Sequence, residues 1–171
     1  DFVATLSDFK KLKLHKGRNK VDAAIAAVDE GVVDPSGAIV GIGIPGNEVV
    51  APQVGMRVMK AGRTTGVTHG IIDLVNASFI VGYSAACSPD AESFDVRFVK
   101  QFRIVSADGT DISEGGDSGS VVLEDSDTCP RQVGLLFAGN SAFTVANKMK
   151  KVLKAVKKMK PKGKAELVGC E

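Results

Sequence analysis

A serine surrounded by glycines is the residue in this sequence best suited to covalent chemistry. Ser118 lies in the segment GGDSGS (residues 115–120), between a turn-like stretch, SADGTDISE, and a strand-like stretch, SVVLE. A nucleophilic serine needs an exposed Oγ and nearby backbone N–H groups that bind the oxyanion of a tetrahedral intermediate. The flanking glycines allow a tight backbone and leave room for a substrate carbonyl. We therefore predict that Ser118 is a nucleophile and that the N–H groups of Gly116 and Ser118 form an oxyanion hole. An ordinary Gly/Asp/Ser turn is the alternative.

Two further motifs accompany this serine. The segment GLLFAG (residues 134–139) follows GDSGS and its strand, and GRTTG (residues 62–66) precedes them, followed by THG. Together these motifs resemble the nucleophile region and substrate-binding wall of the chymotrypsin-like serine peptidases, in particular bacterial members such as α-lytic protease and the streptogrisins. The sequence of residues 1–155 also resembles those of a bacterial group related to the plant Narrow leaf 1-like proteins.

The resemblance implies roles for two charged residues near the serine. In the bacterial peptidases, the arginine of GRTTG forms a buried ion pair with the aspartate that precedes the catalytic serine. Carried over, Arg63 would pair with Asp117 and fix the oxyanion loop, so that no N-terminal amine would be needed. A solvated turn residue is the alternative for Arg63.

An aspartate in the N-terminal part matches a third family motif. Asp22 lies in NKVDAAIAAV (residues 19–28), which looks like the catalytic aspartate motif of the family. It is the only acidic residue within that apolar run, which fits a buried carboxylate that orients a catalytic base. A helix N-cap before AAIAAV is the alternative.

The histidine that a serine triad needs has no evident counterpart in the sequence. His15 lies only seven residues before Asp22, too close for the strand-and-loop arrangement of the family. His69 gives the order Asp-His-Ser, but its position beside GRTTG is not catalytic in the resembled peptidases, which favours a strand residue. We therefore expect the catalytic histidine on a separate N-terminal fragment of the same protein, and this chain alone to be nearly inert.

The resemblance also implies a primary substrate pocket. Its floor would lie near Ile112 and Ser113, and its wall would be Phe137, Ala138 and Gly139. Ile112 at the floor would indicate an apolar substrate residue, whereas Asp111 would indicate a basic one. A shift of one residue in the alignment reverses the answer, so the specificity stays open.

The elements that must position these residues are mostly short strands. Strand-like runs separated by Gly-rich turns predict an all-β barrel or sandwich, and residues 94–104 alternate with period two. With the resemblance, we expect a chymotrypsin-like double β-barrel: residues 1–50 as the remainder of a partial first barrel and a linker, residues 51–146 as a complete second barrel, and residues 147–171 as a basic helix and tail. The expected strand-like runs are residues 21–28 (strand or short helix), 55–60, 67–75, 79–83, 94–104, 120–123, 132–138 and 143–146.

The C-terminal segment combines a basic face with an apolar one. Residues 147–164 hold nine lysines and no acidic residue, whereas the rest of the chain holds 13 basic and 20 acidic residues. A terminal helix with a solvated lysine face is favoured over a nucleic-acid or membrane-surface binder. Its apolar residues recur at helical spacing, and Pro161 and Gly163 are expected to end it: Val145, Met149, Val152, Leu153, Val156 and Met159.

Composition and cysteine usage set the remaining limits. The 171 residues are 44% hydrophobic and 25% charged, which excludes a wholly disordered chain, and no apolar run approaches the ~20 residues of a membrane helix. Cys87, Cys129 and Cys170 form no CxxC motif, so no metal site is expected; one disulfide with a free thiol and three reduced thiols both stay open.

The sequence thus predicts a serine endopeptidase that acts on peptides or proteins without a cofactor. The alternative is an inactive peptidase-like binding or scaffold module.

Overall fold

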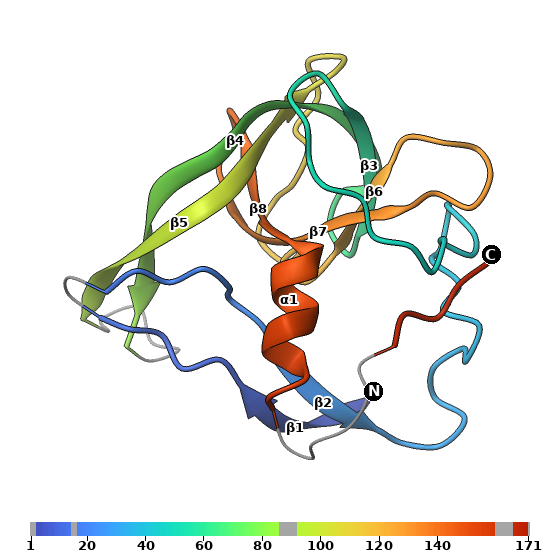
Figure 1. The fold of residues 1–171 in the computed structure, drawn as a ribbon, viewed down its shortest axis with the longest axis horizontal. Coiled ribbons are helices and arrows are strands. Elements are labelled where there is room, and N and C mark those ends of the chain that lie inside the picture. Colours follow the sequence, from blue (N-terminus) through green and yellow to red (C-terminus); the bar gives the residue numbers. More distant parts are fainter. Residues whose placement is uncertain (1–2, 15–16, 86–91, 160–165, 171) are drawn as a thin grey trace.

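The computed structural model describes residues 3–14, 17–85, 92–159 and 166–170 of the chain. Strands dominate these residues, and a single short helix follows the last strand (Figure 1). No helix among them is long and apolar enough to cross a membrane. The elements are β1 (Ala4–Phe9), β2 (Ala24–Val28), β3 (Arg57–Gly62), β4 (Gly66–Ser84), β5 (Ser93–Ser106), β6 (Val121–Glu124), β7 (Gln132–Gly139), β8 (Thr144–Lys148) and α1 (Met149–Val156).

Six strands form a closed antiparallel barrel in the order β3-β4-β5-β8-β7-β6. Pairing of β3 with β6 closes it, with Met59 opposite Leu123. The β-barrel expected from the sequence is therefore present. The two apolar runs at 67–75 and 79–83 belong to one strand, β4, because bulges near Asn76 allow it to bend and continue rather than end.

A bulge in β5 changes which side chains face the barrel interior. Strict alternation would place Lys100 on the same face as Phe98 and Phe102. Instead, Lys100 has φ 62° and is exposed, while the pairing register with β4 shifts between Val99 and Gln101. The bulge thus keeps the lysine in water and both phenylalanines buried.

The barrel interior is a continuous apolar core. Phe102 is fully buried at its centre and packs against Gly134, where a Cβ atom would collide with the aromatic ring. Truncation of such a phenylalanine to alanine costs about 3–5 kcal/mol. The buried members of this core are Val58, Ile72, Phe102, Ile104, Ile112, Val122, Val133, Leu136 and Ala146.

The first two strands do not belong to the barrel. Strands β1 and β2 form a separate two-stranded antiparallel sheet, drawn below α1 and the barrel in Figure 1. The apolar face of α1 packs on Val21 and Ala23 through Met149 and Val152. Val145 lies in β8 rather than in the helix, because its pairing with Arg103 and Ala138 continues the barrel.

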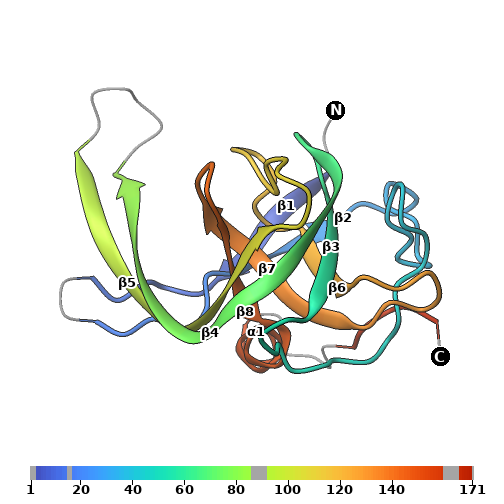
Figure 2. The ribbon, with the colours of Figure 1, turned by 90° about the horizontal axis from the view of Figure 1, so that it is seen from above.

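The long β4–β5 hairpin extends beyond the barrel, as both views show (Figures 1 and 2). Its outer part meets the N-terminal segment, where Asn19 forms a parallel bridge with Phe98. The backbone of Asn19 donates to Arg97 O at 3.0 Å and accepts from Val99 N at 2.8 Å. The segment that leads to Asp22 is therefore fixed on the barrel rather than only on β1 and β2.

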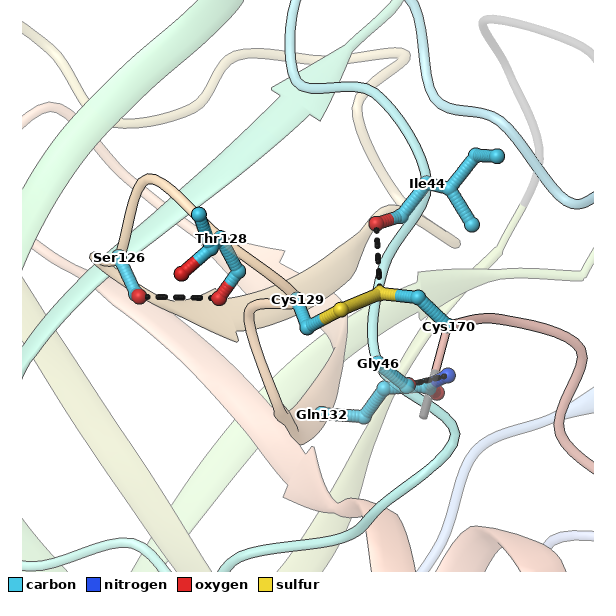
Figure 3. The surroundings of a disulfide bond; sticks show 7 residues. All are labelled: Ile44, Gly46, Ser126, Thr128, Cys129, Gln132 and Cys170. Carbon is cyan, nitrogen blue, oxygen red and sulfur yellow. Dashed lines mark hydrogen bonds between the residues drawn. A yellow bond between two sulfur atoms is a disulfide. The ribbon is translucent and has the colours of Figure 1, made fainter.

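A disulfide between Cys129 and Cys170 fastens the C-terminal segment to the β6–β7 loop (Figure 3). Cys170 also bonds through its backbone to Pro45 and Asn47, at 2.9 and 3.0 Å. Of the alternatives left open by the sequence, one disulfide is therefore present, while Cys87 lies outside the described residues.

Candidate active site

The loop that carries Ser118 has a conformation that depends on its glycines. Gly116 has φ 108° and Gly119 has φ 95°, values that side chains with a Cβ atom rarely adopt. The loop is fixed to the barrel because Gly119 N donates to Leu136 O at 2.8 Å, and within the loop Ser120 Oγ donates to Asp117 O at 2.6 Å. Ser118 itself is exposed.

Asp117 fixes this loop from inside. Its side chain is fully buried and accepts hydrogen bonds from Thr64 N (2.7 Å), Thr65 N (3.3 Å), Thr65 Oγ1 (2.7 Å) and Glu114 N (3.1 Å). Burial alone would raise the pKa of Asp117, but the hydrogen bonds from Thr65, Glu114, Thr64 and Lys60 outweigh it and hold the pKa well below its usual range. Asp117 is therefore a buried carboxylate anion.

The cation that faces Asp117 is Lys60, not Arg63. Lys60 Nζ lies 3.2 Å from Asp117 Oδ2, and the lysine is only 1% exposed. Its ammonium also bonds to Gly66 O at 3.0 Å and to Thr65 Oγ1. The prediction that Arg63 forms the ion pair with Asp117 is therefore wrong. Among the described residues, no salt bridge joins these two side chains, and Lys60 supplies the positive charge.

Arg63 lies instead against the loop that precedes Ser118. A Cβ atom at Gly116 would collide with the Arg63 guanidinium and with Thr64 Oγ1, and Thr64 Oγ1 donates to Gly115 O at 2.9 Å. The turn between β3 and β4 therefore packs directly on the loop before Ser118. The sequence signal for Lys60 was its place as a charged residue within the apolar strand RVMKAG.

The predicted oxyanion donors have no partner within this loop. Among the described residues, no hydrogen bond uses the N–H of Gly116 or that of Ser118, whereas the N–H of Asp117 between them donates to Glu114 O at 3.1 Å. Both N–H groups are thus left for an acceptor outside the protein, as oxyanion donors must be. Their role stays a prediction.

Asp22 faces the same cavity as Ser118. This cavity has a volume of about 340 Å³ and is lined by the segment after Asp22, by Ser118 and by strand β7. The Asp22 backbone is fixed by the buried Asn147, whose amide accepts from Asp22 N and donates to Asp22 O, both at 3.1 Å. A role as a helix N-cap is excluded, because residues 24–28 form β2.

Tyr83 is a site residue that the sequence analysis missed. Its hydroxyl donates to Asp22 Oδ2. Burial, with the hydrogen bond to Asp22 and the charge of that carboxylate, raises the pKa of Tyr83, so the phenol stays protonated as a donor. The tyrosine comes from the outer part of β4, 61 residues away in sequence, and no local motif marks it.

The histidines do not complete a triad among the described residues. His69 lies in β4, and its Nδ1 is 3.1 Å from Asp125 Oδ1 on the side of the barrel where β3 and β6 meet. It lines neither cavity beside Ser118. His15 lies outside the described residues.

Ser118 also lines a larger cavity, of about 570 Å³. Four of the five predicted pocket residues line it: Ser113, Phe137, Ala138 and Gly139. The fifth, Ile112, is wrong as a pocket residue, because its side chain is buried in the barrel core against Ile104. Its neighbours Asp111 and Glu114 line the cavity instead.

The family described as the Nal1 C-terminal domain matches residues 18–160. The chain belongs to this family. No curated protein matches the chain. Several solved structures share its fold, among them serine proteases, a chymotrypsin and an α-lytic protease homolog. The Nal1 C-terminal domain match agrees with the similarity to Narrow leaf 1-like proteins noted from the sequence.

Three of these structures show the extent of the likeness. A glutamic acid specific serine protease is 21% identical, with a TM-score of 0.55 over 80% of this chain and 66% of its own. Nocardiopsis protease is 18% identical, with a TM-score of 0.56 over 91% and 77%. An α-lytic protease homolog, N4, is 20% identical, with a TM-score of 0.54 over 90% and 70%. At these identities the likeness shows the fold of this Nal1 C-terminal domain. The chain spans about two thirds of the length of the first proteases it matches.

Proposed function

We propose that this chain is the nucleophile-bearing part of a serine endopeptidase that hydrolyses peptide bonds through an acyl-enzyme on Ser118. The observation that carries the proposal is the arrangement around this residue. Ser118 is exposed on a loop fixed by the buried Lys60–Asp117 pair, and it shares a cavity with Asp22. The shared fold with serine proteases supports the same reaction class.

In this reaction, Ser118 Oγ attacks the carbonyl carbon of the scissile bond and transfers its proton to a general base. The N–H groups of Gly116 and Ser118 stabilise the oxyanion of the tetrahedral intermediate. Collapse of the intermediate breaks the C–N bond, the base returns the proton to the leaving amine, and a peptidyl ester remains on Ser118. Water activated by the same base then hydrolyses the ester.

The base is a histidine of an N-terminal segment outside these 171 residues. It would enter the cavity between Asp22 and Ser118. Tyr83 bonds to Asp22 Oδ2, whereas among the described residues no hydrogen bond reaches Asp22 Oδ1. A carboxylate accepts at both oxygens, so Asp22 can hold an imidazole N–H and keep its bond to Tyr83.

An inactive binding or scaffold module on the same fold is the second candidate. It is favoured by one observation: no basic side chain among the described residues forms a hydrogen bond with Ser118 or Asp22, and a tyrosine is bound to the carboxylate. In such a module the cavities beside Ser118 would bind a peptide without cleaving it.

A fluorophosphonate probe distinguishes the two candidates. Applied to the protein together with its N-terminal region, the probe should form a phosphonate ester on Ser118 as fluoride leaves, detected by intact mass and peptide mapping. The variant Ser118→Ala should lose the label, and Ser126→Ala, at an exposed serine of the β6–β7 loop, should keep it. The 171-residue chain alone should react at least about 10³-fold more slowly, because it lacks the base. A folded complete protein without any label on Ser118 would refute the peptidase and leave the binding module.

A further inference from the structure

We propose that the larger cavity beside Ser118 selects a cationic side chain, so that the substrates are peptides with lysine or arginine at the residue whose carbonyl Ser118 attacks. The inference rests on the proposed function for the identity of the substrate. Its physical basis, a cavity that prefers cations to neutral and anionic groups, can be tested without catalysis.

The charge of the lining is the first argument. Among the described residues that line the cavity, Asp111 and Glu114 are the only charged ones, and both are exposed to solvent at its surface. Arg63 lies against Gly116, in the same loop, and is not part of the lining. The cavity is therefore negatively charged, and carboxylates form their strongest hydrogen bonds with ammonium and guanidinium groups.

The position of Ile112 is the second argument. An apolar pocket floor would need this side chain, but it is buried in the barrel core, where it also fills the space beside Gly70. Asp111, the residue before it, is exposed and lines the cavity instead. Of the two candidates that the sequence left open for the pocket, Ile112 and Asp111, the cavity is lined by Asp111.

The shape of the lining is the third argument. Glycines at positions 82, 115 and 139 leave the cavity open, and at Gly139 a Cβ atom would lie 3.1 Å from Ser113 Oγ. Apolar surface comes from Phe137 and Leu136. Lysine and arginine combine an apolar stem with a charged end, so the stem can lie on this surface while the charge reaches the carboxylates.

Binding of two small probes to the chain tests the charge preference directly. Phenylguanidinium and phenylurea have nearly the same shape and differ in charge, and their dissociation constants are measured by amide chemical shifts in NMR titrations. Phenylguanidinium should bind at least tenfold more tightly, with shifts in residues 113–115 and 137–139. The preference should fall to less than threefold in Asp111→Asn and remain in Asp127→Asn, an exposed aspartate outside the cavity lining.

Equal binding of the two probes, no detectable binding of either, tighter binding of phenylacetate, or a preference unchanged in both Asp111→Asn and Glu114→Gln would overturn the proposal. Failure of the peptidase proposal has a different signature. In that case the guanidinium preference persists while the complete protein neither reacts with fluorophosphonate nor cleaves peptides. If both proposals hold, the complete protein cleaves after arginine at least tenfold faster, in kcat/KM, than after norleucine.

Discussion

The exchange of Lys60 for methionine removes the cation that pairs with the buried Asp117 carboxylate. Both side chains are almost completely buried, with 2% and 0% of their surfaces accessible. Loss of one partner from a buried ion pair costs about 3–5 kcal/mol, because the other charge stays uncompensated. Asp117 keeps its hydrogen bonds from Thr64, Thr65 and Glu114. We therefore expect the lower end, about 3 kcal/mol, or about 6–12 °C in Tm for a chain of this size.

The assay is urea unfolding followed by circular dichroism at pH 7 and again at pH 3. In the native protein the pKa of Asp117 is lowered, so its contribution to stability is present above an unfolded-state pKa of about 4 and is lost as the pH falls through the folded-state pKa. Without Lys60 the folded-state pKa of Asp117 rises, and the carboxyl group becomes protonated earlier. The difference between the native protein and Lys60→Met should therefore be smaller at pH 3 than at pH 7.

Three further variants control the experiment. Lys150→Met removes an exposed lysine of α1 and should change the stability by less than about 0.5 kcal/mol. Asp117→Asn, alone and combined with Lys60→Met, completes the cycle that gives the coupling energy of the pair. The reasoning fails if Lys60→Met costs less than about 1 kcal/mol, if its cost is independent of pH, or if Arg63→Ala is the more damaging change.

The remaining predictions concern the loop and the C-terminal segment. Gly116→Ala should destabilise the protein by about 1–3 kcal/mol and slow fluorophosphonate labelling of the complete protein, because φ 108° and the Arg63 guanidinium exclude a Cβ atom; an unchanged melting temperature and labelling rate would contradict this. Reduction of the Cys129–Cys170 disulfide, or its replacement by serines, should lower the free energy of unfolding by about 4 kcal/mol, from the loop entropy of a 41-residue separation. Urea unfolding with and without reductant measures it, and a cost below about 1 kcal/mol would show that the loop estimate does not apply.

Local motifs allowed much of the fold and the nucleophile loop to be predicted from sequence. GGDSGS carries its own turn chemistry, and the strand-like runs around it correspond to β5, β6, β7 and β8. The two wrong predictions at the site, Arg63 as the partner of Asp117 and Ile112 as a pocket residue, depend on tertiary packing. Lys60 and Arg63 are both cations near one turn, and only the packing of β3 decides which side chain reaches Asp117.

The partners of Asp22 could not be predicted because they come from distant parts of the chain. Asn147 lies 125 residues away and Tyr83 lies 61 residues away, and each is an ordinary strand residue in its own segment. Likewise, Ile112 and Asp111 differ by one position, and only closure of the barrel decides which of the two enters the core. Long-range pairing of this kind leaves no periodic signal in the sequence.

The bond between Asn147 and the Asp22 backbone has a consequence for assembly. It joins the acid of the proposed triad to β8, a strand of the same barrel that carries Ser118. A segment that brings the proposed histidine would therefore meet Asp22 and Ser118 already held beside one cavity of the barrel. Its association needs to order only its own residues, so the conformational entropy lost on binding falls on the incoming segment alone. This preorganisation would favour binding of the proposed histidine-bearing segment.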